Sequence, residues 1–385
     1  MIVEVRPGPM TNKGGELILR TVVDRLGGRW DLAVEHWIGP YSARSRLGLL
    51  QKLWWKRLGP LAGLPGQVVP SAIRRSYGLV SEGDVDAVLD ASGYGYGDKF
   101  GPERTERAAA NARRWRRKGI PHILLPQAFG PFTSPRIQRA ARSLISQADL
   151  VFARDRVSLE AIVSLDVPGA EARLAPDITV SMAGHPPTPS GETGTPLGFL
   201  VPNEKMLQVA GHGVGEAYLA FLASAAVELR ARGVNPVLLV HETSGGDQRL
   251  ANTVAGMVPG GVPVLEEEDP IRLKGLIGTG VILVGSRFHA LLAALSQGVP
   301  VIATGWSHKY PALLEDYGCP EFSLELPAAP EAISQRLDAA LGDGRGALVS
   351  GLLSHAATQK QRLEAVWDEV VACIEEGRPA RRAAR

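Results

Sequence analysis

The sequence is poor in cysteine, in excess charge of one sign and in long apolar runs. Its two cysteines, Cys319 and Cys373, lie far apart, and no His or Cys stands near them at the spacing of metal ligands. A disulfide framework and a zinc site are therefore not expected. The formal net charge is only +2, which gives no indication of a nucleic-acid partner.

Targeting and membrane-spanning patterns are also missing. The first residues, Met1-Ile-Val-Glu-Val-Arg6, place an acidic residue inside a very short apolar run, unlike a signal peptide. No uncharged apolar stretch is long enough to span a bilayer. With so few cysteines, we expect a cytoplasmic protein that at most contacts the inner face of the membrane.

The common nucleotide and hydrolase motifs are absent as well. Gly93-Tyr-Gly95-Tyr-Gly97 lacks the G-x-G-x-x-G order, and no G-x4-G-K-[ST] loop occurs. The sequence also lacks a G-x-S-x-G elbow, an H-E-x-x-H helix and a C-x-x-C pair. We therefore expect neither a metal nor an organic cofactor.

What is present is an alternation of apolar strands and amphipathic helices along 385 residues, 45% of them hydrophobic and 21% charged. This pattern is typical of parallel sheets covered by helices on both faces. It predicts two doubly wound, Rossmann-like domains facing a cleft. We place an N-terminal α/β domain at 1–183, a Pro- and Gly-rich linker at 184–196, a C-terminal α/β domain at 197–353, and a C-terminal helix with a basic tail at 354–385.

The first half contains six predicted strands, at 2–6, 32–37, 85–90, 120–126, 148–153 and 172–174. A loop at 7–16 follows the first strand, and a glycine-rich turn at 91–98 follows the third. The second half contains strands at 197–201, 236–241, 262–265 and 281–284, with helices between them at 214–232, 246–257 and 269–277.

The stretch 281–310 combines fold and chemistry. The apolar run Val281–Val284 is typical of a buried parallel strand, and Gly285 ends it. We expect Ser286 to cap the next helix, which would place Arg287 and His289 in its first turn. Unpaired backbone N–H groups favour an anion there.

Further cationic or titratable side chains follow other predicted strands. They are Arg154 in the first half, and His241 and Lys309 in the second. Because ligands of doubly wound sheets bind at the carboxyl ends of strands, these positions indicate a cationic cleft suited to a small polyanion. Each also has an ordinary interpretation, since Arg154 and Lys309 could be solvated surface charges and His289 a structural residue.

A set of motifs resembles the polysaccharide pyruvyl transferase family, in the family's order from residue 12 to about 317. The motifs are Asn12-Lys-Gly-Gly15, Gln127-Ala-Phe-Gly130-Pro131-Phe132, Ala148-Asp-Leu-Val-Phe-Ala-Arg154-Asp155, Asp177, His241 with Asp247, Gly285-Ser-Arg287-Phe-His289-Ala, and Lys309. The resemblance implies a fold of the glycosyltransferase B kind. It also implies transfer of a pyruvyl group from phosphoenolpyruvate to two hydroxyls of a sugar, giving a cyclic ketal and phosphate.

On this hypothesis the donor's phosphate and carboxylate need two cationic poles, which arginine and lysine provide. We expect Arg154, Arg287 and Lys309, with Ser286, to bind the donor. His289 is the candidate acid/base, assisted by Arg287. Secondary candidates are His241, Asp177, Asn12, Gly15 and Asp98. His241 with Asp247 could equally be a turn and cap pair, and Asp177 could simply anchor a turn.

The expected acceptor is a sugar, a glycan or a lipid-linked glycan, bound on the side of the N-terminal domain. Residues Ile38–Ser81 contain seven Lys and Arg but no Asp or Glu. The segment could contact a membrane surface, or form a basic amphipathic helix packed on its own domain. Two alternative functions are a nucleotide-sugar transferase with the same fold and a non-catalytic glycan-binding protein.

Overall fold

The structure is a computed structural model that describes residues 1–54, 63, 66, 68–186, 194–209, 214–242, 245–305, 307 and 309–377. The chain folds into two compact units. Unit 1 consists of Met1–Met10, Gly15–Ile178 and Arg362–Arg385, and unit 2 consists of Thr11–Gly14 and Thr179–Gln361. The chain enters unit 2 briefly at residues 11–14, and the long segment of unit 2 begins after residue 178. Of the expected linker at 184–196, residues 187–193 lie outside the described part of the chain.

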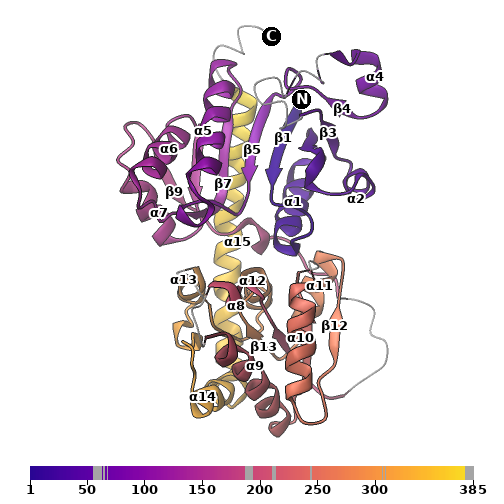
Figure 1. Ribbon diagram of the computed structural model, residues 1–385, viewed down its shortest axis with the longest axis vertical. Helices are drawn as coiled ribbons and strands as arrows, with labels where there is room; N and C mark the ends of the chain where they lie inside the picture. The colour runs from indigo at the N-terminus through magenta and orange to yellow at the C-terminus, as the bar shows by residue number, and fades with distance from the viewer. Residues whose placement is uncertain are drawn as a thin grey trace. The chain divides into compact units, whose positions relative to one another are not determined.

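Unit 1 is built on a parallel sheet in the order β4-β3-β2-β1-β5-β7-β8-β9, with β6 paired to β7 (Figure 1). The chain winds outward from β1 in both directions, as expected for a doubly wound sheet. The strands are β1 (Ile2–Pro7), β2 (Asp31–Glu35), β3 (Leu50–Lys52), β4 (Leu79–Val80), β5 (Ala87–Ala91), β6 (Tyr94–Tyr96), β7 (His122–Phe129), β8 (Leu150–Ala153) and β9 (Ala172–Leu174).

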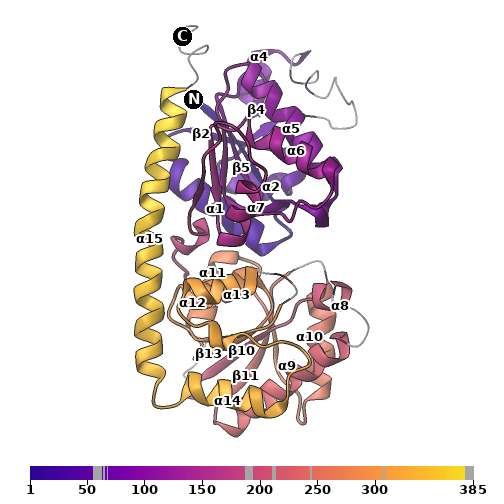
Figure 2. The same ribbon diagram turned by 90° about the vertical axis from the view of Figure 1, so that its left-hand side faces the viewer.

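Helices cover both faces of this sheet. On one face, α5 (Pro102–Arg117) packs against α6 (Pro135–Ile145), and their buried side chains, Trp115 and Ile137 among them, join the core beneath. Along the opposite face runs the second half of α15 (Arg345–Glu376), as Figures 1 and 2 show. There α1 (Lys13–Leu26) reaches α15 through an ion pair between Arg25 and Glu364.

Two helices of unit 1 begin at a side-chain cap. Asp155 caps α7 (Arg156–Val163) by accepting from the Ser158 N–H at 2.7 Å. Ser134 accepts from the Ile137 N–H at 3.3 Å and so caps α6. Side-chain oxygens at these positions satisfy N–H groups that the helix itself leaves unpaired.

The glycine-rich turn predicted at 91–98 is wrong in part, because Tyr94–Tyr96 forms the short strand β6. It pairs with β7, which runs on through Pro126 to Phe129 instead of ending at 126. Gly97 lies against the Gly130 backbone, where an added Cβ would come 2.3 Å from the carbonyl oxygen. The glycines therefore allow two backbones to approach closely.

The acid-free segment 38–81 is not the single packed amphipathic helix considered from the sequence. It contributes the edge strands β3 and β4 and two short helices, α2 (Tyr41–Arg46) and α4 (Ser71–Ser76). Residues 55–62, 64, 65 and 67 lie outside the described residues. The β-strand periodicity was hidden because β3 and β4 are only three and two residues long.

Unit 2 has a second parallel sheet in the order β12-β11-β10-β13-β14. Its strands are β10 (Leu197–Val201), β11 (Asn235–Val240), β12 (Val264–Glu266), β13 (Ile282–Gly285) and β14 (Val301–Ala303). The winding outward from β10 repeats the doubly wound plan. Every pairing in the two sheets is parallel, so the predicted α/β class is confirmed.

The helices of unit 2 are α8 (Lys205–Val209), α9 (Val214–Ala231), α10 (Gly246–Met257), α11 (Pro270–Gly278), α12 (Phe288–Leu295), α13 (Lys309–Asp316), α14 (Pro330–Leu341) and the first half of α15. The last helix begins at Arg345, nine residues before the expected start at 354. In the part of the chain that is described, no helix has the length and apolarity needed to cross a bilayer.

Candidate functional site in unit 2

The turn between β13 and α12 is held rigidly. Gly285 lies where a Cβ would meet the Val201 carbonyl oxygen at 2.5 Å, so only glycine fits. The fully buried Ser286 hydroxyl is 2.6 Å from the Tyr218 hydroxyl. The Ser286 carbonyl accepts from Asn203 Nδ2 at 2.7 Å and from the Tyr310 hydroxyl at 2.8 Å.

These contacts correct the expected role of Ser286. The N-cap residue of α12 is Arg287, which makes no side-chain cap, and His289 is the second helical residue. The Ser286 side chain instead fastens the turn to α9 through Tyr218. Its hydroxyl therefore supports the turn that presents Arg287 and His289, since it is buried away from solvent.

Arg287 is a buried cation held by two carboxylates. Its Nη1 lies 2.6 Å from Glu242 Oε2, and its Nη2 bonds to Asp247 Oδ1. Asp247 is itself fixed, because its carboxylate accepts from the Glu204 N–H at 3.0 Å and from the Glu242 N–H at 3.2 Å. Such pairing compensates a charge that burial would otherwise make very costly.

The pKa shifts follow from this arrangement. Burial alone would lower the pKa of Arg287, but Asp247 and Glu242 raise it, so the guanidinium stays charged. For Asp247, burial raises the pKa and outweighs the opposing effect of Arg287. The pKa of His241 lies well below its usual value because the ring is buried and stands near the charges of Arg287, His289 and Lys13. His241 is thus a neutral imidazole at pH 7.

His289 lies against the segment Thr11–Gly14. A Cβ on Gly14 would come 2.0 Å from His289 Nδ1, so the glycine backbone and the imidazole are in direct contact. The Asn12 side chain accepts from the Gly14 N–H at 3.0 Å, and Asn12 forms an antiparallel bridge with Glu242. The Asn12 loop and the Arg287 cluster are therefore joined within unit 2.

Lys309 begins α13 and lies near the Phe288 ring. Its Nζ is 5.6 Å from the centre of the Phe288 ring and 5.0 Å from that of Tyr310. The Phe288 ring in turn meets the His289 ring edge-on, with centroids 5.3 Å apart. The Phe288 ring is thus a neighbour of both a lysine and a partly buried imidazole, and all three belong to unit 2.

The remaining predicted residues lie in unit 1. Arg154 and Asp177 are both buried and form an ion pair at 3.1 Å. The Asp98 carboxylate accepts from the Thr133 N–H at 3.0 and 3.1 Å, and so holds the loop that follows Gly130. Gly15 begins the second segment of unit 1 and packs on the Pro9 carbonyl, where a Cβ would be 3.3 Å from the oxygen.

Unit 2 therefore brings together Asn12, His241, Asp247, Arg287, His289 and Lys309. The sequence analysis missed Glu242, Gly14 as a contact of His289, and the supporting residues Asn203, Tyr218 and Tyr310. Glu242 had one available signal, because it follows His241 at the carboxyl end of β11. The supporting residues had none, since they come from distant elements.

Among proteins with known roles, the amylovoran biosynthesis protein AmsJ of Erwinia amylovora is 24% identical over 267 residues. The alignment includes 63% of this chain and 61% of AmsJ. The chain thus spans about three fifths of the length of this curated relative.

Three solved structures are similar over nearly the whole chain. A glycosyltransferase from Rickettsia africae has a TM-score of 0.60 at 12% identity, covering 97% of each chain. UDP-GlcNAc 2-epimerase from Neisseria meningitidis, bound to UDP-GlcNAc, has 0.57 at 9% identity, covering 95% of this chain and 100% of its own. HepE from Anabaena, in complex with UDP-glucose, has 0.56 at 12%, covering 97% and 99%.

These likenesses concern the fold, which is of the glycosyltransferase B kind that the sequence predicted. The family is shown by a different comparison, in which the model of the polysaccharide pyruvyl transferases matches residues 12–308. That span opens at the Asn12 loop and includes Glu242, Arg287 and His289. The chain belongs to the polysaccharide pyruvyl transferase family.

Proposed function

We propose that this transferase takes a pyruvyl group from phosphoenolpyruvate and forms a cyclic ketal on a sugar of a glycan or glycolipid. The observation that carries the proposal is the position of His289 at the amino end of α12. There it touches Gly14, and the Phe288 ring that it meets edge-on also lies near Lys309. A proton carrier thus stands beside a lysine and a helix terminus, which both favour an anion.

In the first step, a sugar hydroxyl attacks C2 of phosphoenolpyruvate while C3 accepts a proton. A bond forms between C2 and the sugar oxygen, and the proton of the hydroxyl passes to a base. The C2–C3 double bond becomes a single bond, and C3 becomes a methyl group. His289 in its protonated form supplies the proton to C3, because imidazole titrates near neutral pH. The product is a tetrahedral carbon that carries the sugar, the carboxylate, the methyl group and the phosphate.

In the second step, a neighbouring hydroxyl of the same sugar displaces the phosphate. A second C2–O bond forms and the bond from C2 to the phosphate oxygen breaks. The neutral His289 left by the first step accepts the proton of the second hydroxyl, and the phosphate takes up the proton that the base accepted in the first step. Lys309 stabilises the negative charge on the leaving phosphate as a point charge.

Arg287 is less available to bind the donor than an unpaired arginine would be. Both of its terminal nitrogens bond to carboxylates, and its Nε is buried without a hydrogen-bond partner among the described residues. Glu242 is its more exposed partner, with 19% of the side chain accessible. We therefore propose that the donor anion meets Arg287 by competing with Glu242, while Asp247 keeps the guanidinium in place.

The experiment is phosphate release from phosphoenolpyruvate with a panel of sugar acceptors. His289→Asn keeps the size of the side chain but cannot deliver a proton, so we expect the rate to fall by about 10² to 10⁴. The control is His355→Asn at an exposed histidine of α15, which should leave the rate unchanged. A His289→Asn enzyme as fast as the wild type would contradict the proposal.

A second candidate function, transfer from a nucleotide sugar, has one observation in its favour. The epimerase and HepE structures, similar in fold, hold UDP-GlcNAc and UDP-glucose. Thermal unfolding separates the two functions. Stabilisation by phosphoenolpyruvate but not by UDP-glucose favours pyruvyl transfer, and the reverse result favours a nucleotide-sugar donor.

A further inference from the structure

Unit 1 contains a cavity of about 870 Å³ that the donor site in unit 2 does not use. It is bordered by residues at or after the carboxyl ends of four adjacent strands, and by one side of α5. These residues include Pro7 at the end of β1, Trp37 after β2, Trp54 after β3 and Ser92 after β5. The sheet winds outward in opposite directions from β1 and β5, and doubly wound sheets bind ligands at that switch point.

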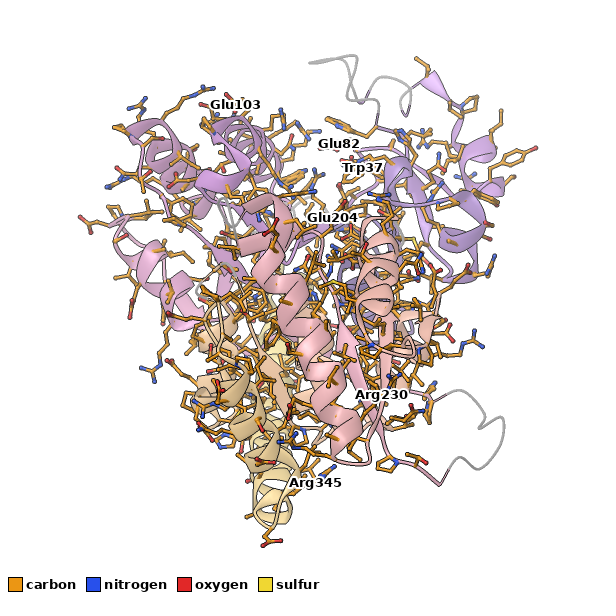
Figure 3. All side chains as sticks on the ribbon, turned by 60° about the horizontal axis from the view of Figure 1, so that its bottom comes forward. Trp37, Glu82, Glu103, Glu204, Arg230 and Arg345 are labelled. Atoms are coloured by element: carbon orange, nitrogen blue, oxygen red, sulfur yellow. The ribbon has the colours of Figure 1, made fainter. Side chains whose placement is uncertain are left out.

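The wall of the cavity is unusually aromatic, with Trp37, Trp54, Tyr96 and Trp115. Trp37 is 42% exposed, and its indole N–H bonds to the Glu35 carboxylate (Figure 3 labels Trp37). Deeper in the cavity, the indole N–H of Trp115 donates to Glu82 Oε1 at 3.2 Å. Because carboxylates hold the polar edges of these indoles, the ring orientations are set and apolar ring faces line the space.

A network of buried charges holds this wall in place. Arg6 bonds to Glu4 at 2.7 Å and to Glu35 at 2.9 Å, and the buried Lys52 pairs with Glu4 and Glu82. The guanidinium of Arg114 bonds to Glu82 at 3.0 Å and stacks over Trp54 at 4.5 Å. Three cations and three carboxylates therefore balance each other, and the aromatic wall is pre-organised.

Two further arginines on α5 are outside this network. Arg104 and Arg107 are exposed, lie one helical turn apart and border the same cavity. Within the described part of the chain, neither forms an ion pair; Arg104 stacks on Phe100, with 5.1 Å to the ring centre. Asp90 is the one carboxylate among the cavity residues, and it is bonded to the Tyr96 hydroxyl. The mouth of the cavity is therefore positive.

Aromatic faces and free guanidinium groups select a particular chemistry. The C–H face of a sugar ring packs on an indole, and its hydroxyls find partners in Ser92 and Asn111. Arginine binds a carboxylate or phosphate through charge-assisted hydrogen bonds. The geometry points to this cavity as the acceptor site and to an anionic saccharide as the acceptor. The sugar ring stacks on Trp37, and the carboxylate or phosphate of the saccharide binds Arg104 and Arg107. The assignment as acceptor site rests on the proposed pyruvyl transfer.

The test is direct binding to the full chain without phosphoenolpyruvate, by saturation-transfer NMR and calorimetry. The probes are glucose, glucuronic acid and glucose 1-phosphate. Stronger binding of glucuronic acid identifies a carboxylate as the recognised group, and stronger binding of glucose 1-phosphate identifies a phosphate. If neither anionic probe binds better than glucose, or if none binds saturably, the inference is overturned.

Variants locate the binding. Combined Arg104→Ala and Arg107→Ala should weaken the preferred anionic probe about tenfold or more and leave glucose unchanged. Trp37→Ala should weaken every probe, and Trp37→Phe should restore part of the loss. The matched control is Arg117→Ala, an exposed arginine of α5 that does not border the cavity. Equal weakening by the control, or none by the cavity variants, would contradict the assignment.

These outcomes are independent of turnover. Binding that depends on Trp37 and Arg104 in a protein that fails to use phosphoenolpyruvate would overturn the proposed function while retaining a saccharide site in unit 1. Turnover of phosphoenolpyruvate that is unaffected by the cavity variants would retain the function and place the acceptor elsewhere.

Discussion

Each unit contains a buried cation that is paired with two carboxylates. Arg287 has Asp247 and Glu242 in unit 2, and Lys52 has Glu4 and Glu82 in unit 1. Removing one member of such a group leaves the others buried and unpaired, which costs more than the pair itself contributes. Single substitutions in these groups are therefore expected mainly to lower the free energy of unfolding.

Lys52 provides the clearest test of this at the level of one residue. Its side chain is 1% exposed, and its Nζ is 2.5 Å from Glu82 Oε2. We expect Lys52→Met to lower the free energy of unfolding by about 3–5 kcal/mol, because two buried carboxylates each lose one of their two cations. Urea denaturation measures the change.

Two further variants complete this test. Lys360→Met at an exposed lysine of α15 should change stability by less than about 0.5 kcal/mol. Adding Glu4→Gln to Lys52→Met should recover part of the loss, since one uncompensated charge is removed. A Lys52→Met protein as stable as the wild type would show that the charge network contributes little.

His241 predicts a pH dependence of stability. Burial and nearby Arg287 lower its pKa well below 6.5 in the folded protein, so the unfolded chain binds the proton more readily. This contribution is absent above about pH 6.5 and destabilises the fold as the pH drops below that value, by up to about 1.4 kcal/mol per pH unit.

The measurement is urea denaturation at pH 7.5 and pH 5.5. His241→Gln cannot take up the proton, so its stability should fall less than that of the wild type between these two pH values. An identical loss of stability in the variant and the wild type would show that His241 does not titrate in the predicted direction.

At the scale of elements, the contact between the first residues of α1 and the start of α12 leads to a prediction about turnover. The first residues of α1 belong to unit 2, where Gly14 touches the His289 ring. We expect Gly14→Ala to reduce turnover about a hundredfold or more, because a Cβ 2.0 Å from Nδ1 forces the imidazole out of position. Phosphate release at saturating phosphoenolpyruvate measures this.

The matched control for Gly14→Ala is Gly28→Ala, since a Cβ there meets nothing within 4 Å. It should retain full turnover. Circular dichroism and thermal unfolding would establish that the Gly14→Ala protein is still folded. Wild-type turnover in that variant would argue that the orientation of His289 is unimportant.

The elements themselves were largely predictable, because strands buried on both faces appear as short apolar runs. The predicted strand 197–201 has the bounds of β10, and the predicted helix 246–257 those of α10. Short edge strands such as β3 and β4 were missed, since two or three residues carry no periodicity. The early start of α15 was missed because its first turns contain two glycines and a single charge.

The site was predictable only in part. Arg287 and His289 follow a strongly apolar strand, so their position at its carboxyl end could be expected. The cap assigned to Ser286 was wrong because its hydroxyl bonds to Tyr218, a residue far away in the sequence. For the same reason, no local pattern could show that Glu242 pairs with Arg287, or that Asn12 bridges to Glu242.

At the scale of the whole molecule, each unit repeats one doubly wound plan and has its own set of candidate residues. Unit 2 holds His289, Lys309 and the Arg287 cluster, and unit 1 holds the aromatic cavity with Arg104 and Arg107. The family match extends from residue 12 to 308 and so includes parts of both units. We infer that donor and acceptor recognition are divided between the two sheets.

The most direct test of the central claim is the identity of the reaction product. The enzyme is incubated with phosphoenolpyruvate labelled at its carbon atoms and with the best acceptor from the panel. We predict one phosphate released for each labelled pyruvate bound, and an acceptor whose mass rises by pyruvate less one water, with both lost in His289→Asn. Phosphate release without label on the acceptor, or labelled product at the wild-type rate from His289→Asn, would contradict the account.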